Sequence, residues 1–293
     1  MTTASTKAAP TPKIKSSALK PRSFISWVTF FFMIFAVIAW LFPFWMALAN
    51  AIKTPADFVA QGPLAFPAHP TFEHVIKFWK ESDFPVRFWN STWTSLLGAA
   101  ITVAFGFLTA YAIGIGKIKG RTWILGVFMV AFTIPQEALI YPLYTAAKKI
   151  GLYDNLLSIA LIFGITGIAF STYLISSVLT EFPNELVEAA KIDGANAWQM
   201  MTRVVLPILR PTLMVIMVMV FIYNWNEFLI PLVLLPSNDN MTVALSIALT
   251  SGQWGAEPTY RAAAALLGAA PSILFFIIFQ RSLMRGVTMG SSK

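Results

Sequence analysis

Cysteine is absent from this sequence of 293 residues, and histidine occurs only as His69 and His74. A chain without cysteine has no disulfide bonds, no thiolate metal ligands and no cysteine nucleophile. Both histidines lie in one connection between apolar runs, and no metal-ligand or nucleophile spacing surrounds them. The sequence therefore predicts no catalytic residue, no metal ligand and no cofactor on this chain, and it does not favour an enzyme.

Charged residues are also scarce, at 12% of the chain against 57% hydrophobic residues, and the mean hydropathy is +0.69. This composition is typical of a chain embedded in a lipid bilayer. The formal net charge is +8, but the basic residues are scattered between apolar runs and form no stripe. We therefore predict no nucleic-acid partner and interpret the basic residues as topology signals.

The apolar runs are long enough to cross about 30 Å of hydrocarbon, which takes about 20 helical residues. Two of them, the third and the fifth, are interrupted by Glu137 and Glu227. In order, the runs lie between residues 22 and 53, between 87 and 117, beyond 121, between 154 and 181, beyond 210, and between 261 and 281. The sequence thus predicts an all-α membrane protein with six transmembrane helices.

Lys and Arg in short connections favour the cytoplasmic side of a membrane. With six spans, one side receives the basic residues near both termini and in two connections, whereas acidic residues largely offset those on the other side. We expect both termini to be cytoplasmic, residues 1–22 to form a basic tail, and residues 23–293 to form the membrane domain. An outer loop is expected at about 50–87 and an inner loop at about 181–206. A cleaved signal peptide is the rival, but the uncharged stretch from 23 to 52 exceeds a signal core.

The inner loop has the signals of two short helices joined by a glycine turn. Pro183 suits a first helical position, and Glu185 lies in the first turn, where the helix dipole favours a carboxylate. Gly194 suits the left-handed conformation that ends a helix. Asn196 and Gln199 have the spacing of a capping box. From these signals alone, an amphipathic surface loop and a protein-docking loop are equally favoured.

A more specific pattern lies in the same loop. It consists of a carboxylate with two alanines, a later carboxylate with a glycine, and a proline about a dozen residues further on: Glu188, Ala189, Ala190, Asp193, Gly194 and Pro207. This pattern resembles the EAA loop of binding-protein-dependent ABC permeases. The stretch from Trp225 to Phe228 resembles the sugar-importing branch and its MalG-like subunits, and Asn90 with Ser91 and the residues from Phe279 to Gly286 are similar to it as well.

The resemblance implies the type I permease fold of ABC importers and a place in the bacterial cytoplasmic (inner) membrane. It implies that the EAA loop is a coupling helix seated on a cytoplasmic ATPase. The implied partners are a second, MalF-like permease, an ABC ATPase homodimer that binds ATP and Mg²⁺, and an extracytoplasmic solute-binding protein. The implied cargo is a carbohydrate or related polyol.

Polar residues within the apolar runs are candidates for a translocation path or a gate. A carboxylate facing lipid at mid-membrane costs about 2.5 to 3.5 kcal/mol, so Glu137 and Glu227 are expected to face protein or water. For Glu137 we favour a structural or gating role over solute contact. Glu227 ends a cluster in which aromatic and amide groups suit sugar binding or helix packing equally well: Asn224, Trp225, Asn226 and Glu227.

Two other transport classes fit the composition. An ion-coupled secondary transporter has the same number of spans but no need for a docking loop, and an ABC permease for another solute class would lack the stretch at Trp225. A self-contained ATPase is not favoured. Gly116 and Lys117 resemble the end of a phosphate-binding loop, but Tyr111 and Ile118 replace the glycine and the hydroxyl that the loop requires.

Overall fold

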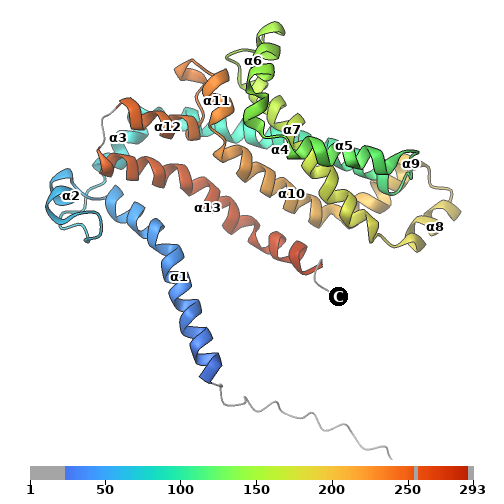
Figure 1. The fold of residues 1–293 in the computed structure, drawn as a ribbon, viewed down its shortest axis with the longest axis horizontal. Coiled ribbons are helices and arrows are strands. Elements are labelled where there is room, and N and C mark those ends of the chain that lie inside the picture. Colours follow the sequence, from blue (N-terminus) through green and yellow to red (C-terminus); the bar gives the residue numbers. More distant parts are fainter. Residues whose placement is uncertain (1–23, 254–256, 290–293) are drawn as a thin grey trace, which may run out of the picture. The chain divides into compact units, whose positions relative to one another are not determined.

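The computed structural model describes residues 24–253 and 257–289, with side chains at 24–249 and 257–280. Within these ranges the chain forms helices and turns and no strand (Figure 1). The predicted all-α class is therefore confirmed. The predicted basic tail, residues 1–22, lies outside the described residues.

The described helices include five that are long and apolar enough to cross a membrane. A bent pair of helices brings the number to six if the pair counts as one span. The five are α1 (Phe24–Ala51), α4 (Phe84–Gly114), α7 (Leu156–Thr180), α10 (Leu206–Asn226) with the residues leading into it from Ala197, and α13 (Pro258–Met289).

The bent pair replaces the single third span that the sequence predicts. Helix α5 (Arg121–Thr133) ends before Ile134, and the chain resumes at an angle of 90° in the 3₁₀ turn η1 (Gln136–Leu139) and helix α6 (Ile140–Lys149). The cause is Pro135. Proline has no N–H to donate, and it holds the residue before it in an extended conformation, here with ψ of 121° at Ile134.

The chain divides into two compact units at residues 46 and 47. The first unit contains residues 24–46 of the apolar helix α1, which carries Pro43 in its interior. The second unit begins at Ala47 and contains all of the other helices. Two clusters of buried apolar side chains form its core.

Small side chains allow α4 and α7 to pack closely in the second unit. At Gly98 on α4, an added Cβ would lie 2.8 Å from Cβ of Phe163 on α7. Thr102 donates a hydrogen bond of 2.9 Å to the carbonyl of Gly164 across the same interface. Such contacts are the usual means of joining helices in membranes, where lipid removes the hydrophobic driving force. Helix α10 lies between α4 and α13 (Figure 1).

Short helices fill the connections. Between α1 and α4 lie α2 (Pro55–Gln61) and α3 (Glu73–Glu81), within the stretch predicted as an outer loop. Beyond α10 lie α11 (Leu229–Leu234), the 3₁₀ turn η3 (Asn238–Asn240) and α12 (Val243–Gln253). Asp154 joins the α6–α7 connection to this region, because its carboxylate accepts a hydrogen bond of 2.9 Å from the hydroxyl of Ser237.

Candidate functional site

Helix α8 (Asn184–Ile192) is the first half of the predicted helix, glycine turn and helix. Pro183 stands immediately before the helix, one position earlier than expected. At the other end Gly194 has φ of +77°, and the N–H of Ala195 donates to the carbonyl of Ala190 at 3.0 Å. A left-handed residue followed by this bond is the usual glycine termination of a helix. The predicted glycine turn is confirmed.

The predicted capping box is also present. The N–H of Gln199 donates to Oδ1 of Asn196 at 2.9 Å, and the N–H of Asn196 donates to Oε1 of Gln199 at 3.0 Å. These two bonds begin α9 (Ala197–Gln199), which continues through the π-helical stretch η2 (Met200–Val205) into α10. Pro207 stands at the start of α10, so the loop enters the apolar helix with no break in helical structure.

Contacts with the apolar helices hold the loop in place. Val187 on α8 is buried in the same core cluster as Met200 and Met201 of η2. The hydroxyl of Tyr111, near the end of α4, donates a hydrogen bond of 3.0 Å to the carbonyl of Ala197. Displacement of this loop would therefore pull on both α4 and α10. Sequence analysis missed this role of Tyr111, and no local pattern indicates its partner 86 residues away.

The predicted coupling residues lie together on this loop and at its exit. Ala190 is half-buried against the core, and the others are exposed: Glu188, Ala189, Asp193, Gly194 and Pro207. Helix α8 also presents apolar side chains outward, since Ile192 is 87% exposed and Leu186 is exposed as well. A short, anchored helix with exposed apolar and acidic side chains is suited to docking on another protein.

The predicted cluster on α10 divides into two pairs, and the first pair is buried. The side-chain amide of Asn224 donates to the carbonyl of Ser95 on α4 at 3.4 Å, and Nε1 of Trp225 donates to the carbonyl of Gly268 on α13 at 3.2 Å. Trp225 is only 2% exposed and packs edge-on against Phe88. These contacts are those of helix packing, the second of the two roles considered for the cluster.

The second pair lies at the surface. Asn226 is exposed, and its side-chain amide donates to the carbonyl of Ile222 on its own helix at 2.7 Å. Glu227 is half-buried and follows the end of α10. Its Oε1 accepts hydrogen bonds from the N–H groups of Leu229 at 2.8 Å and Ile230 at 3.2 Å, so it satisfies the first donors of α11.

Glu137 is exposed in η1, directly after the break in the third run. The phenol of Tyr223 on α10 interacts electrostatically with the carboxylates of both Glu137 and Glu227. Tyr223 is itself exposed. The carboxylates of Glu137 and Glu227, 90 positions apart in sequence, thus both lie within electrostatic range of a tyrosine that sequence analysis did not identify.

An acid and a histidine form a clamp in the connection between α1 and α4. The carboxylate of Asp57 accepts hydrogen bonds from the ring of His69 at 3.1 Å and from the backbone N–H of His69 at 2.8 Å. These bonds, the one with the ring foremost, hold the pKa of Asp57 below its ordinary value of 3.8. Among the described residues, no group of three or more His, Cys, Asp or Glu side chains is arranged to hold a metal ion.

Comparison with known proteins identifies the family to which this chain belongs. Residues 116–288, which include α8 and α10, match the family described as the binding-protein-dependent transport system inner membrane component. The chain is 30% identical over 254 residues to the lactose transport system permease protein LacG of Rhizobium radiobacter. The aligned segment covers 86% of this chain and 91% of the relative. It is 31% identical over 263 residues to the diacetylchitobiose uptake system permease protein DasC of Streptomyces coelicolor, covering 86% and 92%.

A solved structure has the same fold. It is the crystal structure of a bacterial ABC transporter involved in the import of the acidic polysaccharide alginate, which matches with a TM-score of 0.76 at 20% identity and covers 88% of this chain and 95% of that one. The fold is therefore that of an ABC importer permease, as the EAA resemblance implied. From the family match and the relatives, this chain belongs to the binding-protein-dependent transport system inner membrane components and is a permease subunit of an ABC importer, a translocation component and not an enzyme.

Proposed function

We propose that this subunit imports a carbohydrate or a related polyol. Three relatives of 30% or 31% identity support this proposal, because they are named for the transport of lactose, diacetylchitobiose and trehalose. Each covers more than four fifths of this chain. The shared chemistry of these solutes is a sugar ring with hydroxyl groups, which suits a path of hydrogen-bonding and aromatic side chains.

In this proposal the subunit has six spans, and both termini are cytoplasmic. The bent pair of α5 and α6 counts as the third span. The non-helical backbone at Pro135 is compatible with this, because irregular backbone is tolerated at membrane depth where it faces protein or water. Lys117, Lys119 and Arg121 then lie on the same side as α8, in agreement with the excess of basic residues on cytoplasmic sides. The basic tail, residues 1–22, also lies on that side.

Helix α8 is the coupling helix in this proposal. The observation that carries it is the anchored loop, in which Gly194 ends α8 with φ of +77° and the capping box starts an unbroken run into α10. A rigid connection of this kind transmits the motion of a docked ATPase to a membrane helix. The partners are an ABC ATPase homodimer that binds ATP and Mg²⁺, a second MalF-like permease, and an extracytoplasmic solute-binding protein.

One face of this subunit lines the translocation path or its gate. It is marked by two carboxylates and two neighbouring side chains: Glu137, Glu227, Tyr223 and Asn226. Glu137, Tyr223 and Asn226 are exposed and Glu227 is half-buried on this subunit. This exposure supports the proposal, because charged groups in membrane proteins face cavities or partner subunits and avoid lipid. Asn224 and Trp225 support this face from behind through their buried hydrogen bonds.

The absence of cysteine makes a direct test of docking simple. In Ile192→Cys, the single thiol stands at a position that is 87% exposed on α8. We expect a bifunctional thiol-to-amine reagent to link it to the ATPase, with a yield that differs between ATP-bound and nucleotide-free membranes. Val59→Cys on α2 is the matched control, because Val59 is 84% exposed but lies in the proposed outer loop.

A cross-link from position 192 and none from position 59 supports the proposal. Equal labelling of the ATPase from both positions would contradict the orientation. Absence of any ATPase adduct at position 192, in membranes where the variant still imports solute, would contradict the docking role of α8.

A further inference from the structure

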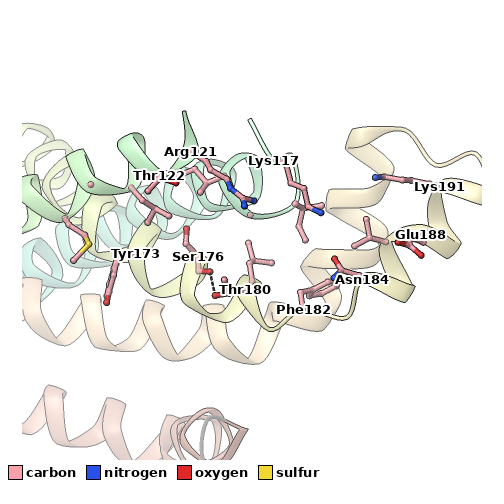
Figure 2. Close-up of a pocket in the computed structure, with 18 residues that line it drawn as sticks. Lys117, Arg121, Thr122, Tyr173, Ser176, Thr180, Phe182, Asn184, Glu188 and Lys191 are labelled. Atoms are coloured by element: carbon pink, nitrogen blue, oxygen red, sulfur yellow. Dashed lines mark hydrogen bonds between the residues drawn. The ribbon is translucent and has the colours of Figure 1, made fainter. Parts of the chain in front are cut away.

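A cavity of about 750 Å³ lies beside the inner face of α8. It is bounded by the end of α4, the connection from α4 to α5, the first turns of α5, the end of α7 and helix α8 itself. Figure 2 shows polar and charged side chains that border it, among them Lys117, Arg121, Ser176, Thr180, Glu188 and Lys191. The translocation path proposed above does not include this cavity.

The lining of the cavity carries an excess of positive charge. Lys117, Arg121 and Lys191 line it together with one carboxylate, that of Glu188, so the lining has three positive charges and one negative charge. Where the structure describes side chains, none of the three cations forms an ion pair. Cations gathered around a cavity without counter-ions of their own favour the binding of an anion with several oxygen atoms.

A buried hydroxyl faces the same cavity. Ser176 lines it and is only 7% exposed, and its Oγ has no hydrogen-bond partner among the described residues. The neighbouring hydroxyl of Thr180 bonds to backbone carbonyls of its own helix. The hydroxyls of Ser171 and Thr172 on the same helix also have no hydrogen-bond partner among the described residues and do not line the cavity, so Ser176 adds a polar residue to the wall but does not by itself indicate a ligand.

The remaining wall is apolar and lies at the level where the apolar helices end. Helix α4 ends at Gly114, α5 begins at Arg121, and α7 ends at Thr180, so the cavity spans the boundary between apolar and polar parts of the chain. The lining also contains the apolar side chains of Ile113, Leu125, Met129 and Leu179. A free inorganic anion makes no use of such a wall, whereas a phospholipid uses both parts.

We propose that this cavity binds an anionic phospholipid. The phosphate accepts hydrogen bonds from Arg121, Lys117 and Lys191, and an acyl chain lies along the aliphatic wall. Because Arg121 belongs to α5 and Lys191 to α8, the lipid joins the membrane helix to the coupling loop. That consequence for transport rests on the proposed function, whereas the lipid binding itself does not.

The test measures lipid occupancy by native mass spectrometry on the complex that co-purifies with this full chain. The probes are phosphatidylglycerol and phosphatidylcholine with identical acyl chains, added in equal amounts. We expect the wild-type chain to retain phosphatidylglycerol preferentially. Each neutralised cation near a membrane surface weakens binding by about 1 kcal/mol, so Arg121→Gln lowers the affinity about fivefold, and Arg121→Gln with Lys117→Gln lowers it about 25-fold.

Two further variants separate a built site from a charged surface. Lys119→Gln removes the same charge from the same connection, but Lys119 does not line the cavity, so we expect affinity within twofold of wild type. Gly126→Leu keeps every charge and fills the aliphatic part, since an added Cβ at Gly126 meets nothing within 4 Å. We expect it to lower phosphatidylglycerol occupancy severalfold while the complex stays intact.

Equal retention of the two lipids by the wild-type chain would overturn the proposal. So would an equal loss in Lys119→Gln and Arg121→Gln, which would show only general attraction to the surface. Release of the bound lipid by excess inorganic phosphate, with no effect of Gly126→Leu, would identify the site as one for a free anion. Lipid occupancy is read on this subunit whether or not an ATPase co-purifies, so a failure of the importer proposal is recognised separately.

Discussion

Replacing Gly194 with valine tests whether the conformation of the coupling loop matters for transport. Gly194 has φ of +77°, and a Cβ added there meets no atom within 4 Å. The substitution therefore creates no clash, and its cost is that of holding a non-glycine residue in the left-handed region. That cost is roughly 1 to 2 kcal/mol.

If transport requires the loop in this conformation, 1 to 2 kcal/mol reduces the competent population by roughly five- to thirtyfold. Gly194→Asn should lose much less, because asparagine tolerates the left-handed region. The assay is uptake of labelled solute into proteoliposomes, together with ATPase activity stimulated by the liganded binding protein. Assembly of the complex is checked by size-exclusion chromatography.

Gly151 provides a matched control. It has φ of +72°, and its added Cβ also meets nothing within 4 Å, but it follows α6 and is far in sequence from the coupling loop. Gly151→Val should carry the same backbone cost with little effect on coupling. The reasoning is refuted if Gly194→Val transports at the wild-type rate, or if Gly151→Val and Gly194→Val uncouple ATP hydrolysis from uptake equally.

Further predictions concern the cap, the helix interface, the carboxylate after α10 and the outer connection. Asn196→Ala removes the capping box at a cost of about 1 kcal/mol and should lower stimulated ATPase activity about fivefold, with Gln at 196 giving no recovery. Gly98→Leu overpacks the α4–α7 contact by about 1 to 3 kcal/mol and should lower the melting temperature in detergent; an unchanged value would contradict the packing described. Glu227→Ala should lower the melting temperature, because two N–H groups lose their acceptor. Glu227→Gln should keep the wild-type melting temperature and change the apparent affinity for solute. Unaltered uptake in Glu227→Gln would show that the residue acts only as a helix cap. Because the pKa of Asp57 is lowered in the folded state, its bonds to His69 stabilise the connection above pH 3.8 and are lost as the pH falls through the lowered pKa. Hydrogen exchange in residues 55–61 should therefore rise only below about pH 4. In Asp57→Asn, the same exchange should be high at neutral pH.

Charged boundaries and local signals made part of the structure predictable. Asp154 and Glu181 bracket an uncharged run, and α7 occupies all but the ends of the interval between them. Gly194, Asn196 and Gln199 act on backbone groups within a few residues, so their roles are readable from spacing alone. The loop could therefore be anticipated in detail, and with it the family resemblance.

Features that depend on three-dimensional packing were not predictable in this way. The charges that bound the third run, and Glu137 within it, do not indicate the 90° bend, which is caused by Pro135. Helix α10 is apolar all round, so periodicity does not show that Asn224 and Trp225 face inward while Asn226 faces outward. The cavity beside α8 gathers residues from positions 113 to 191, and no local pattern indicates it.

The number of spans and the orientation of the termini remain predictions from charge distribution. The single-cysteine approach extends to them, because every introduced thiol is the only one in the chain. A thiol at Val59 should react with a membrane-impermeant reagent added outside intact cells, and a thiol at Ile192 should react only after the membrane is opened. The reverse pattern would contradict the proposed orientation.

The central claim, that this permease is driven by a separate ATPase that docks on α8, is tested most directly by tagging this subunit and purifying it from native membranes. Mass spectrometry identifies the proteins that accompany it, and ATP hydrolysis and uptake are measured with and without the solute-binding protein. The account predicts that an ABC ATPase and a second permease co-purify. It also predicts that liganded binding protein raises ATP hydrolysis roughly five- to thirtyfold less in Gly194→Val than in wild type. A chain that purifies alone and still transports in vesicles without ATP would contradict it.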